Sequence, residues 1–232
     1  MPENDSADSC HWRMSAYKEL VRRVNDLFSS FLSDYCCNCQ QVISRLPEAQ
    51  DDSFDLVEGV YPGCCHRGAG DIFRLEGEPP ERSYLAPEII DGLQRERQLR
   101  LQELAAEACG GTYQLLRHRD NTLTKGAHCQ YFTDKGCSLD VLKGPLCINF
   151  ICPPMRSDLL QVCAGENRDL VGPEQDFLFI YRSLAVISYD RREKVMQEVA
   201  LLERRAADLS RRCRQFLTKK QANSLYEFFT TP

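Results

Sequence analysis

The chain has 232 residues, of which 43% are hydrophobic and 27% are charged, and its 29 Lys and Arg against 34 Asp and Glu give a formal net charge of −5. This is the balance of a globular protein with one large domain or two small ones, and it excludes disorder over most of the chain. A mildly acidic chain lacks the excess of positive charge that binding to a phosphate backbone requires. Nucleic acid is therefore not the expected partner.

The N-terminal segment, 1–34, is predicted to form a helix, because apolar residues recur at three- and four-residue spacing from about residue 14 to 33. The following stretch, 35–87, is rich in Pro and Gly and predicts irregular structure. Pro87-Glu88 is a favourable helix start and Gly110-Gly111 is a stop, so an internal helix is expected near 88–109. Turn signals in 112–154 predict a second irregular stretch.

The C-terminal region, 156–232, is predicted to be helical and to pack on the same domain. A short helix is expected from Ser157-Asp158 through Cys163, and Gly172-Pro173-Glu174 is a start signal for another. Steps of four and three then define an apolar seam of Val195, Val199, Leu202, Ala206, Leu209, Cys213 and Phe216. We favour an amphipathic helix packed on the domain over an intermolecular coiled coil. The Arg pairs beside the seam predict a solvated face, with a protein partner of acidic character as the alternative.

Cysteine is the unusual component, with 13 residues. An odd number leaves at least one thiol outside any disulfide, and the content lies below the roughly 8–10% typical of small secreted disulfide scaffolds. The N-terminus has no apolar core of a signal peptide, and the most apolar stretch, 177–189, is broken by Arg182 and too short to span a bilayer. We predict a cytoplasmic protein without a membrane segment, in a compartment where thiols persist as metal ligands or reactive groups.

Nine of the cysteines fall in two blocks of the irregular stretches. The first block contains Cys36, Cys37, Cys39, Cys64 and Cys65, and the second contains Cys129, Cys137, Cys147 and Cys152. Close pairs such as Cys36 and Cys39 allow a turn to direct two thiolates at one soft or borderline metal ion. Burial as small hydrophobic residues and disulfide pairing are the alternatives, and the clustering in Gly- and Pro-rich sequence favours metal ligation. The expected fold class is therefore mainly α, a helical domain with two irregular cysteine-rich metal-binding loop regions.

The second block resembles the central signature of the YkgJ-like cysteine-cluster family of zinc- or iron-chelating domains, with matches at Phe132, Gly136-Cys137-Ser138-Leu139, Pro145 and Cys147. The chain departs from the family pattern at Asp140, Gly144 and Ile148. The family's N-terminal cysteine signature is similar to the first block, here split between Cys39 and Cys64 by a longer segment. The resemblance covers 35–155. It implies metal ligation by Cys36 or Cys37 together with Cys39, Cys64, Cys65, Cys129, Cys137 and Cys147.

Cys152 is a further candidate ligand, because Cys152-Pro153 resembles the Cys-Pro ending of ferredoxin ligand runs. Eight thiols suffice for two zinc sites or for one four-iron cluster, and the nearly all-sulfur ligand set with long spacings favours an iron–sulfur cluster over zinc. His66 and His128 adjoin cysteines and are either ligands or hydrogen-bonding neighbours of ligands. The remaining cysteines are expected to be buried small hydrophobic residues rather than ligands; they are Cys10, Cys109, Cys163 and Cys213. Among them Cys163 is the first candidate for an additional ligand, because it lies 11 residues after Cys152 on a short segment that could fold back.

Two functions follow from these observations. The first is a metal-binding protein with a structural, electron-transfer or redox-sensing role. The alternative is a cluster-containing protein methyltransferase resembling the flagellin lysine N-methylase group. The sequence contains no nucleotide-binding loop, dinucleotide fingerprint, serine-hydrolase elbow or zincin motif, so whether the chain is an enzyme stays open.

Overall fold

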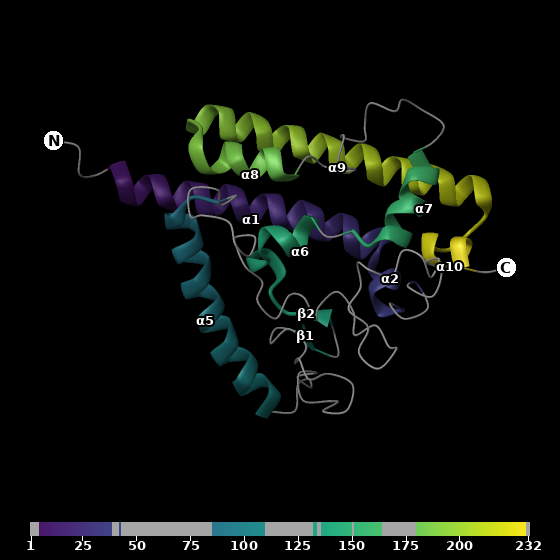
Figure 1. The fold of residues 1–232 in the computed structure, drawn as a ribbon, viewed down its shortest axis with the longest axis horizontal. Helices are drawn as coiled ribbons and strands as arrows, with labels where there is room; N and C mark the ends of the chain where they lie inside the picture. The colour runs from purple at the N-terminus through teal and green to yellow at the C-terminus, as the bar shows by residue number, and fades with distance from the viewer. Residues whose placement is uncertain are drawn as a thin grey trace.

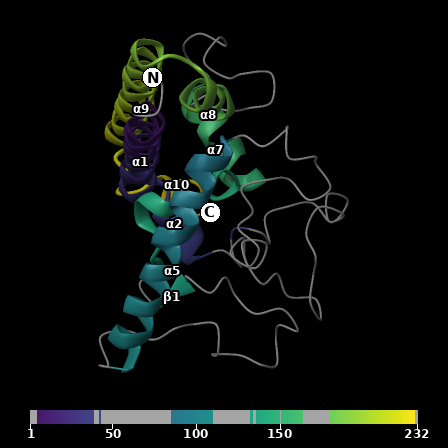
Figure 2. The ribbon, with the colours of Figure 1, turned by 90° about the vertical axis from the view of Figure 1, so that its left-hand side faces the viewer.

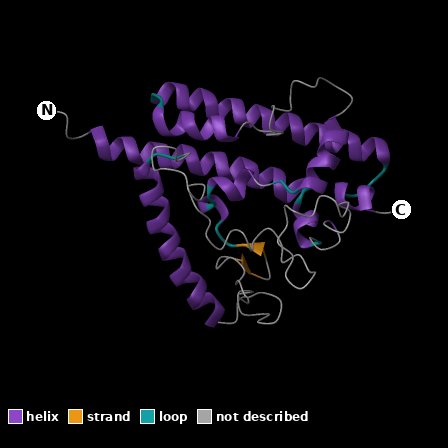
Figure 3. Ribbon diagram, in the orientation of Figure 1, coloured by secondary structure: helices purple, strands orange, loops and turns teal. Residues whose placement is uncertain are grey.

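The structure is a computed structural model that describes residues 5–38, 42, 85–109, 132–133, 136–149, 151–163 and 180–230. In chain order its elements are α1 (Asp5–Phe31), α2 (Ser33–Cys37), α5 (Pro87–Cys109), β1 (Phe132–Thr133), β2 (Gly136–Cys137), the 3-10 helix η5 (Asp140–Leu142), α6 (Pro145–Asn149), α7 (Pro153–Cys163), α8 (Ile180–Tyr189), α9 (Arg192–Lys220) and α10 (Leu225–Thr230). β1 and β2 pair in antiparallel fashion, with Phe132 opposite Cys137. The predicted mainly α class is confirmed, as Figure 3 shows.

The two longest helices, α1 and α9, lie side by side and run in the same direction (Figures 1 and 2). The predicted seam of α9 is buried from Val195 to Cys213, and α1 buries Tyr17, Leu20 and Val21 completely. α8 precedes α9 and packs against it in the opposite direction (Figure 1). The interpretation of the seam as an intramolecular packing surface is therefore confirmed.

Polar contacts fix α5 and α8 against α1. Arg13 of α1 donates hydrogen bonds to the carbonyl oxygens of Ile187 and Asp190, at 2.5 and 2.9 Å, and so caps the C-terminal end of α8. α5 approaches α1 closely at Gly92, where a Cβ atom would lie 2.9 Å from the Sδ atom of Met14. Lys18 of α1 forms an ion pair with Glu96 of α5, at 2.6 Å.

Two helix starts differ from the sequence predictions. α1 begins at Asp5, well before the apolar periodicity, and α7 begins at Pro153 rather than near Ser157. Proline is favourable in the first turn of a helix because its missing N–H has no partner there, so Pro153-Pro154 start α7 rather than precede it. The start signal at 172–174 lies outside the described residues.

The two cysteine-rich stretches are not irregular throughout. Cys36 and Cys37 lie in α2, Cys137 lies in β2 and Cys147 lies in α6. The prediction of loops was wrong at these positions, because the packing of short helices on the long ones overrides local turn signals. Most of the residues 39–84 and 110–131 lie outside the described part of the chain.

Candidate metal centre

The first cysteine block begins on α2, and Tyr35 holds this helix in place. Cys36 is exposed and Cys37 is the last residue of α2. The Tyr35 side chain is 1% exposed, and its hydroxyl donates a 2.8 Å hydrogen bond to the Oδ2 atom of Asp158 on α7. Its ring meets that of Tyr226 on α10 edge to face, with 5.7 Å between the ring centroids. The start of the first block is thereby anchored to two C-terminal helices.

The second block ends on the same helix that Tyr35 contacts. Cys152 is buried and directly precedes α7, and Asp158 lies in the second turn of α7 with 1% exposure. The Tyr35–Asp158 hydrogen bond joins residues that are 123 positions apart in the sequence. It therefore ties the helix that carries Cys36 to the helix that begins beside Cys152.

The segment between Cys137 and Cys147 is held by hydrogen bonds from α1 and α5. Tyr17 donates to the carbonyl oxygen of Lys143, and the buried Arg97 donates to that of Leu142 at 2.7 Å. The Asn25 amide donates to Asp140 at 3.1 Å and accepts from the Lys143 ammonium at 2.7 Å. These side chains come from two helices, so both long-range packing and hydrogen bonds determine where the second block lies.

The departures from the YkgJ-like pattern have structural roles in this chain. Asp140 has a φ of 45°, a conformation that aspartate adopts more readily than tyrosine, and its carboxylate accepts the Asn25 hydrogen bond. Gly144 is buried, and Ile148 is a core residue with 3% exposure. An arginine at either position would put a charged side chain into the core, which is costly without a partner.

The described cysteine-bearing elements α2, β2 and α6 lie on the side of α1 that faces away from α9 (Figure 1). Among the described residues, no three His, Cys, Asp or Glu side chains form a group able to hold a metal ion. The side chains of Cys37 and Cys137 and all of Cys39, Cys64, Cys65, Cys129, His66 and His128 lie outside the described part. By donor chemistry, the predicted ligand set of thiols fits a zinc ion or an iron–sulfur cluster.

Cys163 and Cys213 are buried where α7 packs against α9. Burial raises the pKa of the Cys213 thiol from 9.0 to about 12, and the neighbouring Cys163 adds to the rise. Burial also raises the pKa of Cys163, although the positive charge of Arg212 acts to lower it. The expected burial of Cys213 is confirmed. Cys163 is buried too, and its candidacy as an additional metal ligand stays a prediction.

The residues that position the candidate site were not found from sequence. Tyr35, Asp158 and Arg97 show no local motif, because each acts on a partner remote in the sequence. The one available signal for Tyr35 is its place directly before Cys36-Cys37.

We compared the chain with protein-family models, curated proteins and solved structures, and found no match in any of the three. The resemblance to the YkgJ-like family therefore stays a prediction that rests on the motif positions. In the described residues, no helix is both long enough and apolar enough to cross a membrane.

Proposed function

We propose that this chain is a cytoplasmic metal-binding protein whose clustered cysteines hold an iron–sulfur cluster, with zinc as the alternative metal. The proposed ligands are Cys36 or Cys37, Cys39, Cys64, Cys65, Cys129, Cys137, Cys147 and Cys152. An iron–sulfur cluster would supply one-electron transfer, whereas zinc would supply structural stabilisation.

The observation that supports this proposal best is the buried Tyr35–Asp158 hydrogen bond, because it ties α2 to α7 and so links the two cysteine blocks. The contacts of α1 and α5 with residues 140–143 support it further, since they hold the chain between Cys137 and Cys147. A metal site assembled from distant segments needs such supports, because ligand orientation depends on the groups behind the ligands. The alternative function, a cluster-containing protein methyltransferase, stays a prediction. A protein partner that binds at the C-terminal helix is part of the present proposal.

The test is purification without oxygen, followed by iron, zinc and acid-labile sulfide analysis. We expect a brown protein that absorbs broadly near roughly 400 nm and contains both iron and sulfide. If the protein were colourless and contained stoichiometric zinc and no sulfide, the metal would be zinc and not an iron–sulfur cluster. A protein that binds neither metal would overturn the proposal.

Matched Cys→Ser variants test the ligand assignment. Cys137→Ser and Cys147→Ser replace a soft thiolate by a neutral hydroxyl, so each should lose most of the metal. Cys213→Ser is the control, because the same type of substitution is then made inside the packed seam of α9, at a residue that is not a proposed ligand. It should keep the metal and lose roughly 1–3 kcal/mol of folding free energy. Loss of metal in Cys213→Ser with full occupancy in Cys137→Ser would contradict the assignment.

A further inference from the structure

The C-terminal half of α9 has a charge opposite to that of the whole chain. Residues 204–220 contain seven Arg and Lys and a single Asp, a net charge of +6, whereas the chain carries −5. Asp208 is already paired with Arg211 and Arg212, at 2.5 and 2.7 Å, and Arg205 lies 3.5 Å from the buried Glu198. Two carboxylates of the fold thus already serve as counter-ions to these three cations.

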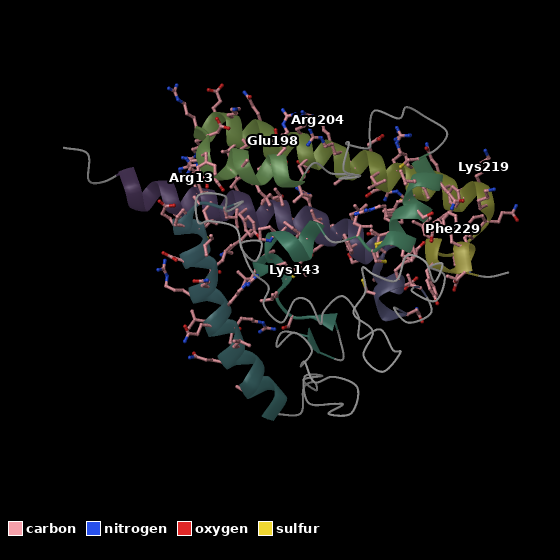
Figure 4. The ribbon with its side chains drawn as sticks, in the orientation of Figure 1. Arg13, Lys143, Glu198, Arg204, Lys219 and Phe229 are labelled. Atoms are coloured by element: carbon pink, nitrogen blue, oxygen red, sulfur yellow. The ribbon has the colours of Figure 1, made fainter. Side chains whose placement is uncertain are left out.

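The remaining cations of this half-helix are Arg204, Arg214, Lys219 and Lys220, and all four are exposed. None of them forms an ion pair with another described residue. Figure 4 shows Arg204 on the outer side of α9, and Lys219 at the C-terminal end of the helix. The C-terminal half of α9 therefore carries exposed positive charge without an internal counter-ion among the described residues.

Aromatic rings adjoin the last of these cations. Phe216 of α9 packs with Phe228 and Phe229 of α10, with ring centroids 4.9–5.5 Å apart, and all three rings are partly exposed. The Lys220 ammonium lies 5.5 Å from the Phe228 ring centroid and 5.9 Å from that of Phe216. We name Phe216, Lys219, Lys220, Phe228 and Phe229 the terminal surface. It has an apolar centre and a basic edge, the usual composition of a protein interface.

The terminal surface adjoins the helix that begins the first cysteine block. Tyr226 of α10 contacts Tyr35 of α2, the residue before Cys36. Both views show α10 close to α2 (Figures 1 and 2). Glu227, the acidic residue of α10, is exposed at the same end.

We infer that the terminal surface docks an acidic protein segment that inserts apolar side chains between the charges. Its lysine side chains can pair with the carboxylates of such a segment, and its phenylalanine rings can pack against aliphatic side chains of the segment. A membrane-binding helix turns its apolar face outward, whereas the apolar face of α9 is buried against α1 and α8. Nucleic acid requires a broader excess of positive charge than a chain of net charge −5 provides. Docking does not require the metal, and the inference rests on the proposed function only in that it names the class of partner for the C-terminal helix.

The test uses the full chain and a fluorescently labelled Glu-rich peptide that carries two Leu residues. Lys219→Glu/Lys220→Glu should weaken peptide binding by at least about tenfold at about 0.1 M salt, because like charges then face each other. The control is Arg192→Glu, which makes the same type of change at an exposed position at the other end of α9. It should change binding by less than about twofold, since charges far from the interface are screened. A peptide with Ser in place of Leu should bind the wild type more weakly.

Hydrogen exchange of the wild type with the peptide should show new protection in α10 and the last turns of α9. Unchanged binding by the double variant, with circular dichroism showing an intact fold, would overturn the inference. Equal weakening by Arg192→Glu would overturn it too, because attraction would then be unspecific. Preferential binding of phosphatidylserine vesicles or of single-stranded DNA would identify a different class of partner and also overturn it. Each of these readouts is independent of the metal content.

Discussion

Tyr35 is the residue through which the candidate metal centre depends most directly on tertiary structure. Its hydroxyl reaches a buried carboxyl group on α7, and its ring supports α10. A buried polar group that loses its hydrogen-bond partner retains the cost of its desolvation. The contact is therefore worth more to the fold than an exposed hydrogen bond of the same length.

Tyr35→Phe should destabilise the protein by about 1–3 kcal/mol, because Asp158 loses a hydrogen-bond donor while remaining buried. Urea unfolding with and without the substitution measures this difference. Tyr189→Phe is the control at a side chain that is 61% exposed, and it should change stability by less than about 0.5 kcal/mol. A smaller loss in Tyr35→Phe than in Tyr189→Phe would show that the buried contact does not support the fold.

Cys213 should make stability depend on alkaline pH. In the unfolded chain its thiol ionises near 9.0, whereas burial raises the pKa in the folded protein to about 12. The folded state therefore keeps a proton that the unfolded state releases. The contribution is fully present below about pH 9 and is lost as the pH rises towards 12.

The measurement is urea unfolding of the wild type and of Cys213→Ala at several pH values. Above about pH 9 the wild type should lose more stability than the variant, because only the wild type has this thiol to ionise. Other titrating groups are common to both proteins and cancel in the comparison. A difference between the two proteins that stayed constant up to about pH 11 would contradict the prediction.

At the scale of single elements, η5 and the residues around it link α1 and α5 to the second cysteine block. Arg97 is 5% exposed and donates to the carbonyl oxygen of Leu142. Arg100 of α5 donates a longer hydrogen bond, 3.4 Å, to the carbonyl oxygen of Ser138. α5 thus acts as a support for the backbone on the N-terminal side of Cys147.

Arg97→Met should keep much of the apolar packing of the Arg97 side chain but remove its hydrogen bond to Leu142. We expect faster amide exchange in 138–149, with α9 unchanged, and weaker metal retention in a chelator competition. Arg95→Met, two residues away at an exposed position, is the control and should leave both readouts unchanged. Equal exchange rates in the two variants would show that Arg97 is not needed to hold this segment.

At the scale of the whole molecule, one apolar core extends from the long helices to the elements that carry the described candidate ligands. α1, α8 and α9 share this core with residues of α2 and α6, and α6 also packs against α8, while α2, β2 and α6 lie on the side of α1 that faces away from α9 (Figure 1). Burial of an apolar seam stabilises α9 without any ligand, at roughly 25 cal/mol per Å² of apolar surface removed from water. Stretches rich in Gly, Pro and Cys bury less apolar surface and depend more on a bound metal.

Removal of the metal should therefore loosen 35–87 and 112–154 before the rest of the molecule. Hydrogen exchange before and after anaerobic chelation should show large increases in these stretches and little change in α9. The C-terminal half of α9 provides an internal control, since its seam packs on α1 and α7. If amide exchange in both stretches were as slow after complete demetallation as before it, the prediction that the cysteine blocks depend on a bound metal would be contradicted.

The sequence by itself determined the helical class, the internal helix at 87–109 and the buried face of α9, because helical periodicity depends on neighbours three and four positions away. It also determined the chemistry of the candidate ligands, since thiols select soft metals wherever they lie. Only the tertiary structure decided that Cys36 and Cys147 are helical and that Tyr35 meets Asp158. These outcomes depend on contacts between residues far apart in the chain, as in the 123-residue separation of Tyr35 and Asp158, and no local pattern encodes them.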